Sequence, residues 1–343
     1  MTTDEAIVSR VYGAYQELWP WPGLEEVLLG RLRGRLRLEK ARSHGDMRHL
    51  LIVGDHVEYT RDANNPAEAN IEGLLPRRNV LARSSAHEIQ ALGANLDRSV
   101  LIASLARPRL RTGFIDRFLV SAHAGQVSPV LLFTKPDLLE AEEREFMEED
   151  LQCYRDLGYS VFVANLLEPE PDALKPLLAL MSEGVTLLAG QSGTGKSTFL
   201  NRILGRAVQP TATISPSSKK GRHTTTNAAL FRHPSGRALL IDSPGVKEWG
   251  IGHLSRDDII AAMPELGAAA HQCQFADCKH ESGSRGCAVQ EILVQSPESG
   301  GLTDERLRSF EQMLASLSEP DRIRTGDYIK PTGRMRTGRR QAP

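Results

Sequence analysis

The chain reads Gly190-Gln191-Ser192-Gly193-Thr194-Gly195-Lys196-Ser197 directly after the apolar run 185–189, and Thr198-Phe199-Leu200 opens a helix-forming stretch behind it. Every fixed position of the pattern G-x-x-x-x-G-K-[ST] is occupied, between a strand and a helix. The glycines let backbone N–H groups turn toward phosphates, Lys196 supplies a positive charge, and Ser197 offers a hydroxyl to Mg²⁺. The segment predicts a nucleoside-triphosphate site in an α/β domain, with Lys196 as a catalytic residue.

A second phosphate-side segment, Asp242-Ser243-Pro244-Gly245, closes the apolar run 238–241. Asp242 stands where a carboxylate would hold Mg²⁺ through water, and the Gly245 N–H could bind the γ-phosphate. The two segments together predict a nucleotide triphosphatase that uses Mg²⁺. The next residue, Val246, cannot orient a water molecule, so intrinsic turnover should be slow.

The base is expected to be read by Thr134-Lys135-Pro136-Asp137, which follows the apolar run 130–133. Asp137 could accept hydrogen bonds from N1–H and the exocyclic amine of guanine, a donor pair that adenine lacks, while Lys135 lies over the base. Lys-Pro-Asp is also a common turn, so the tetrapeptide alone leaves both interpretations open. Ala164-Asn165, after the next strand, is a candidate second contact.

The order of these segments is unusual. In an ordinary GTPase the base-reading motif follows the phosphate loop and the magnesium motif, whereas here 134–137 precedes both 190–197 and 242–245. Domain termini often lie close together, so a circular permutation can preserve the sheet while it moves the chain ends. The order therefore predicts a circularly permuted α/β P-loop GTPase domain.

Length and composition limit the number of domains and the class of protein. A chain of 343 residues predicts two or three domains, and 42 Lys+Arg against 43 Asp+Glu exclude a uniformly basic polyanion-binding protein. Nucleic-acid affinity must come from local patches. No signal-like segment and no run of about 18 apolar residues is present, so we expect a cytoplasmic protein without membrane contact.

One such patch lies near the N-terminus, where residues 31–38 alternate leucine and arginine around one glycine. With the β-type runs that follow, this favours a small OB-like barrel after an irregular N-terminal segment. A basic face on a barrel suits oligonucleotides, although charge can also simply protect an edge strand from aggregation. The predicted RNA-binding residues are Arg31, Arg33, Arg35 and Arg37.

Three of the four cysteines fall within fifteen residues. With one histidine they form Cys-x4-Cys-x-His-x6-Cys, which provides three thiolates and one imidazole for a closed tetrahedral, structural Zn²⁺ site. His271 is an alternative ligand, but it stands only two residues before the first cysteine. The predicted zinc ligands are Cys273, Cys278, His280 and Cys287.

These features, with Gly221-Arg222-His223-Thr224-Thr225-Thr226 and Ala94-Asn95-Leu96-Asp97, resemble the bacterial ribosome small-subunit-dependent GTPases, the RsgA/YjeQ family. The resemblance implies a multi-domain chain: an OB-like RNA-binding barrel at 1–88, the permuted GTPase domain at 89–262 and a mainly helical zinc domain at 263–318. Residues 319–343 are expected to form a disordered basic tail.

The resemblance also implies a function: a monomer that hydrolyses GTP to GDP and phosphate, binds the small ribosomal subunit and its rRNA, and assists late maturation. Nucleotide state would control binding and release, and the subunit would stimulate turnover. An RNA-binding scaffold regulated by nucleotide and a GTPase acting on another RNA or protein are the alternatives. His223 is the internal candidate to orient water, unless it packs against the fold or contacts RNA. Thr224 or Thr225 would join Ser197 and Asp242 around Mg²⁺.

Two positions depart from the family pattern. Thr134 stands where the base-reading motif usually has Asn, which implies the loss of an amide that would bond the base and tether the phosphate loop. Val163-Ala164 replaces the usual Ser-Ala of the second base segment. Guanine specificity is therefore expected to be looser or weaker than the family norm, although Asp137, which carries most of the discrimination, is intact.

Overall fold

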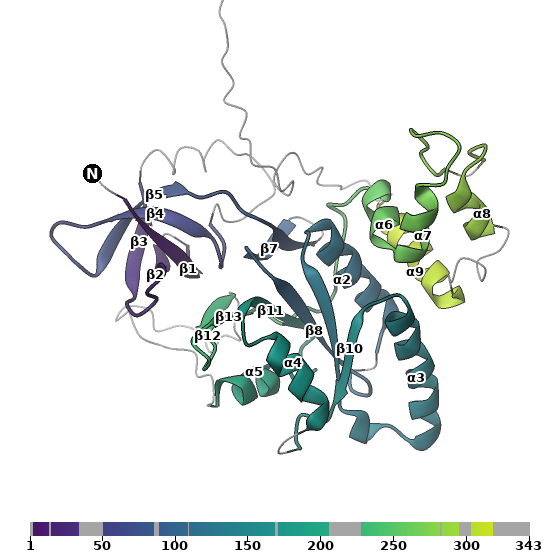
Figure 1. The fold of residues 1–343 in the computed structure, drawn as a ribbon, viewed down its shortest axis with the longest axis horizontal. Helices are drawn as coiled ribbons and strands as arrows, with labels where there is room; N and C mark the ends of the chain where they lie inside the picture. Colours follow the sequence, from purple (N-terminus) through teal and green to yellow (C-terminus); the bar gives the residue numbers. More distant parts are fainter. Residues whose placement is uncertain are drawn as a thin grey trace, which may run out of the picture.

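The computed structural model describes residues 3–13, 15–33, 51–85, 89–108, 110–168, 171–205, 228–281, 283–294 and 303–317. Figure 1 shows three parts along the longest axis: a β-barrel, a central sheet covered by helices, and a cluster of helices at the far end. Within the described ranges, no helix is long and apolar enough to cross a membrane.

Five strands form the closed N-terminal barrel: β1 (Asp4–Tyr12), β2 (Tyr15–Pro20), β3 (Leu28–Leu32), β4 (His56–Arg61) and β5 (Glu68–Leu74). They pair in the order β1-β2-β3-β5-β4, and β4 returns to pair with β1. β3 and β5 run parallel, while the other neighbours run antiparallel. The predicted barrel is confirmed.

The N-terminal segment corrects one expectation, because it is not irregular but supplies β1 and β2 of the barrel. Ala6 and Val8 are buried in the barrel core, while Ile7 between them packs into the core of the central part. Both faces of β1 are therefore covered. Its sequence lacks the apolar and polar alternation that identifies a half-buried strand.

The central sheet has the order β10-β9-β8-β11-β13-β12. Its parallel strands are β8 (Arg98–Ser104), β9 (Ser128–Thr134), β10 (Ser160–Ala164), β11 (Gly184–Gly190) and β13 (Ala238–Asp242). The edge strand β12 (Ala229–Arg232) is antiparallel to β13 and pairs with β1 of the barrel at Ala229 and Arg10. The barrel and the sheet are thus hydrogen-bonded to one another.

A two-stranded hairpin, β6 (Val80–Ser84) and β7 (Ile89–Ala94), joins the barrel to this sheet. The predicted boundary between residues 88 and 89 falls in the hairpin connection. The Ala94 N–H donates to the Val53 carbonyl at 3.0 Å, so the hairpin is also bonded to the segment that precedes β4.

Helices cover both faces of the central sheet (Figure 1). α2 (Thr112–Ala124) and α3 (Ala141–Asp156) share a core with Leu131 and Phe133 of β9, whereas α4 (Lys175–Leu180) and α5 (Lys196–Leu204) share the opposite core with Val130 and Leu132. Alternate residues of one strand therefore enter two cores. This double burial explains the uninterrupted apolar run, and it confirms the predicted α/β sheet.

The C-terminal part is helical, as predicted, with α6 (Arg256–Ala262), α7 (Pro264–Ala270), α8 (Ala288–Val294) and α9 (Asp304–Leu317). α6 packs on α7, and both α6 and α9 pack on α2. The Thr303 hydroxyl accepts a hydrogen bond from the Arg306 N–H at 3.3 Å, which caps the N-terminus of α9.

Candidate functional site

The predicted nucleotide segments meet at one edge of the central sheet. Thr134 ends β9, Ala164 ends β10, Gly190 ends β11 and Asp242 ends β13. These strands are parallel, with Ala164 paired to Thr134 and Asp242 paired to Leu188. Open α/β sheets bind ligands outside the carboxyl ends of their strands, and the predicted residues lie at that edge.

The turn between β11 and α5 depends on its glycines. Gly193 and Gly195 have φ angles of +81° and +98°, a left-handed region that disfavours other residues. A Cβ atom on Gly190 would lie 2.5 Å from the Ile102 carbonyl oxygen of β8. The backbone can take this path only without side chains at these positions, and such a path is the one that lets loop N–H groups turn toward phosphates.

The phosphate loop is held by a hydrogen bond within its own turn and by hydrogen bonds to the segment that follows Asp242. The buried Thr194 hydroxyl donates to the Gln191 carbonyl at 2.9 Å, closing the turn on itself. The Val246 N–H donates to the Gly190 carbonyl at 3.0 Å, and the Gln191 amide donates to the Lys247 carbonyl at 3.2 Å. The phosphate loop and the segment after Asp242 are therefore joined by direct hydrogen bonds.

Lys196 and Asp242 form an ion pair between the start of α5 and the end of β13. The two side chains are only 11% and 13% exposed, so the pair is largely shielded from water. Asp242 and the exposed Ser197 hydroxyl provide hard oxygen donors of the kind that Mg²⁺ prefers. The donor set at this edge therefore fits a magnesium-bound polyphosphate.

The base motif contacts the phosphate loop directly and corrects a second expectation. The Thr134 hydroxyl donates to the Thr194 carbonyl at 2.7 Å, so the tether expected to be lost with the missing Asn is present. The next residue, Lys135, has a left-handed backbone and donates from Nζ to the Gly193 and Arg107 carbonyls, each at 2.6 Å. Asp137 follows in a short 3-10 turn and its side chain is exposed.

The second base segment lies beside the first. Ala164 is buried, and the Asn165 carboxamide oxygen accepts from the Leu167 N–H at 3.0 Å, which shapes the turn after β10. Arg202 of α5 donates to the Leu166 carbonyl at 2.8 Å. The helix that follows the phosphate loop therefore also fixes the loop predicted to contact the base.

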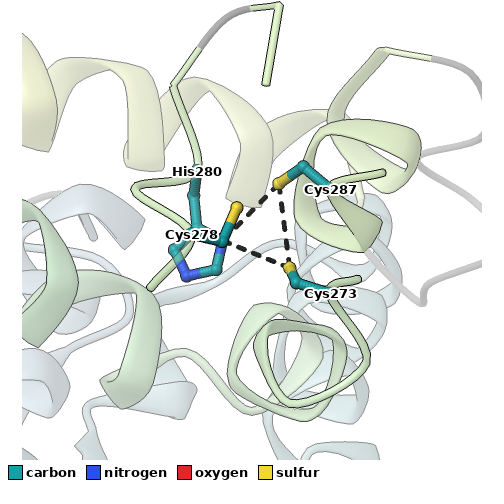
Figure 2. A group of neighbouring side chains, drawn as sticks. All are labelled: Cys273, Cys278, His280 and Cys287. Atoms are coloured by element: carbon teal, nitrogen blue, oxygen red, sulfur yellow. Dashed lines mark hydrogen bonds between the residues drawn. The ribbon is translucent and has the colours of Figure 1, made fainter. Parts of the chain in front are cut away.

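The cysteine and histidine motif forms a cluster at the C-terminal end of the molecule. Figure 2 shows the four predicted ligands facing a common centre. Each residue offers one ligand atom, and these atoms all lie within 4.8 Å of one another. The Cys273 and Cys287 Sγ atoms are 3.9 Å apart, and each is 3.5 Å from His280 Nδ1. His271 is exposed and is not part of the group.

These separations fit a zinc ion. Ligands at the corners of a tetrahedron with Zn–S about 2.3 Å and Zn–N about 2.0 Å lie roughly 3.5–3.8 Å apart. Burial opposes ionisation of Cys273, but hydrogen bonds from the Val289 and Ala288 N–H groups and from the Cys287 and Cys278 thiols together lower the pKa of its thiol. Three thiols and an imidazole form the closed donor set of a structural site.

The loop that carries His280 is braced from two helices. His280 has a φ of 52°, and its carbonyl accepts from Arg256 of α6 at 2.7 Å and from Gln290 of α8 at 2.8 Å. The Gln290 N–H also donates to Cys287 Sγ at 3.4 Å. The ligand loop is therefore fixed by outer partners, as metal sites require.

The family model for RsgA GTPases matches residues 74–252, a stretch that contains the phosphate loop, the base motif and Asp242. The chain belongs to the RsgA GTPase family. It is therefore a GTPase, and its segment order is the circular permutation predicted from the sequence.

Relatives and solved structures agree with this assignment. The small ribosomal subunit biogenesis GTPases RsgA of Haemophilus influenzae (strain PittGG) and of Ectopseudomonas mendocina are 34% and 36% identical to the chain. The alignments cover 78% and 79% of this chain and 76% of each relative. YjeQ from Thermotoga maritima superposes with a TM-score of 0.68 at 26% identity, covering 92% of this chain and 99% of that chain. YloQ, described as a circularly permuted GTPase, shares the fold with a TM-score of 0.65 at 23% identity, covering 92% and 95%.

Several predicted site residues of this RsgA-family chain lie outside the described ranges: Arg35, Arg37, His223, Thr224 and Thr225. The other two residues of the predicted basic face are paired with glutamates of β5. Arg31 bonds Glu68 at 2.9 Å and lies over the Tyr15 ring at 4.9 Å, and Arg33 bonds Glu72 at 2.8 Å. Part of the positive charge on this face is therefore balanced within the barrel.

Sequence reasoning missed a buried charged cluster that joins the GTPase domain to the C-terminal helices. Arg306 of α9 pairs with Asp116 of α2 and donates to Glu265 of α7 at 2.8 Å, while Tyr154 of α3 donates to Asp116 at 2.9 Å. Burial raises the pKa of the Asp116 carboxyl although Arg306 opposes this. Nothing in the sequence distinguishes these residues from exposed charges on amphipathic helices.

Proposed function

We propose that this protein hydrolyses GTP while bound to the small ribosomal subunit, and that its nucleotide state controls binding and release during late maturation. The observation that carries the proposal is the convergence of the phosphate loop, Asp242 and the Thr134–Asp137 motif at one sheet edge. The names of the relatives from Haemophilus influenzae and Ectopseudomonas mendocina support the ribosomal role.

Nucleotide binding would rearrange one ion pair. Lys196 donates to Asp242 in this structure, and a bound polyphosphate would offer Lys196 a stronger anionic partner. Mg²⁺, held by Ser197 and through water by Asp242, would neutralise phosphate charge when bound. Asp242 is followed by the segment that bonds the phosphate loop through Val246, so its release from Lys196 acts directly on the chain that leads to α6.

The group that activates the attacking water would come from outside the sheet edge that carries the phosphate loop and Asp242. The Val246 side chain is buried and apolar, so it cannot orient a nucleophilic water molecule. Its backbone N–H is bonded to the Gly190 carbonyl. We assign that role to His223, with Thr224 or Thr225 completing the Mg²⁺ shell. An imidazole near neutral pH can orient water or take its proton. Slow turnover without the ribosomal particle follows from this arrangement.

The zinc site would have a structural role in docking. Zn²⁺ bound by Cys273, Cys278, His280 and Cys287 would hold together a loop that has little apolar sequence of its own. The same module is joined to α2 through Arg306, and α2 packs against the sheet that holds the nucleotide segments. A nucleotide-dependent change in the segment after Asp242 would therefore reach the C-terminal helices.

RNA contact is assigned to the barrel. Arg31 and Arg33 are followed in the sequence by Arg35 and Arg37, which lie outside the described residues, and Tyr15 beside Arg31 is exposed. Contacts of this kind are led by phosphates and weaken with salt. We place the protein in the bacterial cytoplasm, because it would act on a cytoplasmic particle. We also propose that it acts as a monomer.

Co-sedimentation with purified small subunits tests the proposal. The protein should pellet with the subunits in a non-hydrolysable GTP analogue and remain largely in the supernatant in GDP. Equal pelleting in both nucleotides would instead favour a scaffold whose hydrolysis is incidental. No pelleting in either would indicate a different partner.

A further inference from the structure

The Thr134 side chain has one hydrogen-bond donor, its hydroxyl, and the structure shows which acceptor it contacts. The residue is fully buried at the end of β9, with its Oγ1 2.7 Å from the Thr194 carbonyl oxygen and 3.3 Å from the Ala103 carbonyl oxygen. A threonine hydroxyl is one donor, and the shorter contact takes it. The phosphate loop thus occupies the only hydrogen-bond donor that this side chain has.

An asparagine at the same place would behave differently. Its carboxamide carries two N–H donors, so one could hold the loop carbonyl while the other reached a base acceptor. Guanine presents two such acceptors on its outer edge, N7 and O6. The neighbouring Lys135 directs two of its three Nζ donors to the Gly193 and Arg107 carbonyls, so its ammonium is held at the phosphate loop.

Within this motif, side-chain selection of guanine therefore falls on the other edge of the base. The exposed Asp137 carboxylate, three residues beyond Thr134, is an acceptor that matches the N1–H and 2-amino donors of guanine. An asparagine carboxamide could both tether the phosphate loop and contact the base, but in this chain two different residues do so. The loop tether remains with Thr134, and base selection passes to Asp137.

We propose that Thr134 is a positioning residue for the phosphate loop and that this protein recognises guanine without a contact from Thr134 to N7. The inference rests on the proposed function, in that GTP is the nucleotide. It makes a specific statement about ligands: the protein should not distinguish GTP from 7-deaza-GTP, in which N7 is replaced by C–H. It should distinguish GTP from ITP, which lacks the 2-amino group.

The test is a competition measurement of Kd for GTP, 7-deaza-GTP, ITP and ATP against a fluorescent GDP, with the full-length protein and Mg²⁺. For the parent we expect a 7-deaza-GTP to GTP ratio within about twofold and a loss of about tenfold for ITP. Thr134→Asn should gain an N7 contact and raise the 7-deaza-GTP to GTP ratio about threefold to tenfold.

Two smaller substitutions keep the inference testable if Thr134→Asn fails to fold. Thr134→Val removes the donor and should weaken GTP and 7-deaza-GTP binding equally, by about threefold to tenfold, with their ratio unchanged. Thr134→Ser keeps the hydroxyl and should restore parental affinity for both. A merely structural effect of the buried methyl group would not show this pattern of rescue.

The outcomes separate the two claims. A parent that already prefers GTP over 7-deaza-GTP, with the preference abolished in Thr134→Val, would overturn the inference while leaving the proposed function intact. A folded Thr134→Asn variant whose ratio equals the parental ratio would do the same. A parent that binds ATP as well as GTP would overturn both.

Discussion

Arg306 of α9 and Asp116 of α2 form an ion pair whose side chains are 4% and 0% exposed. The same guanidinium bonds Glu265 of α7, so one cation joins the GTPase domain to two helices of the C-terminal part. Removing this cation while the helices stay packed would leave the Asp116 and Glu265 carboxylates buried without a partner, which is costly. The zinc module is thereby fixed to the sheet that holds the nucleotide segments.

Substitution of Arg306 should loosen this junction. Arg306→Met leaves Asp116 and Glu265 buried without their cation, so we expect a loss of about 3–5 kcal/mol in unfolding free energy. Urea unfolding would measure the loss, and amide hydrogen exchange would place it in α9. Arg308→Met is the matched control, because Arg308 lies on the same helix but is exposed. Equal stability of Arg306→Met and Arg308→Met would refute the structural role of the pair.

The contact between α3 and α9 should depend on pH. Burial and the Glu305 carboxylate raise the pKa of Asp150 to about 6, above its ordinary value of 3.8. Between these values the folded state binds more protons than the unfolded state, so this group stabilises the fold as pH falls and destabilises it as pH rises through 6. Glu305 also accepts from Thr112 of α2 at 2.8 Å, which keeps its carboxylate in place.

Asp150→Asn removes the charge and should make the protein more stable than the parent at pH 7.5, with the difference shrinking at pH 5. Thermal unfolding of both proteins at the two pH values would measure this. Glu142→Gln on the exposed face of the same helix is the control and should show no such dependence. A constant difference between Asp150→Asn and the parent across this range would contradict the assignment.

The metal site gives a third prediction. Cys287→Ser should reduce bound zinc from one ion per chain toward none and increase hydrogen exchange around α7 and α8, while GTP affinity stays within about twofold of the parent, because the site is structural and remote from the sheet edge. Metal analysis and nucleotide titration would measure both. Cys153→Ser should retain zinc, since Cys153 lies on α3 outside the cluster. Folded parental protein without metal would defeat the zinc assignment.

Much of the architecture was predictable because its signals are local. The phosphate loop, the base motif and the Cys3His spacing each occupy a short stretch, and the structure brings each set of described residues together as expected. The strand β9 could be predicted from the sequence because both of its faces are buried, which gives it an uninterrupted apolar run. The same double burial hid β1, whose run of Ala6, Ile7 and Val8 is short and flanked by polar residues.

The contacts between distant segments were not predictable. The bond from Thr134 to Thr194 spans sixty residues, and its existence depends on the path of the loop rather than on either residue type. The sequence therefore suggested a lost tether where the fold supplies one. Arg306 and Asp116 are farther apart still, and each belongs to a helix whose pattern is equally compatible with exposure.

If the small ribosomal subunit switches on GTP hydrolysis by this protein, the rate of phosphate release must depend on the subunit. Phosphate release from GTP should be followed with the protein alone, with purified small subunits, and with small subunits plus Lys196→Ala as the inactive control. We expect slow release from the protein alone, an increase of at least about tenfold with subunits, and no release with Lys196→Ala. Equal rates with and without subunits would contradict it.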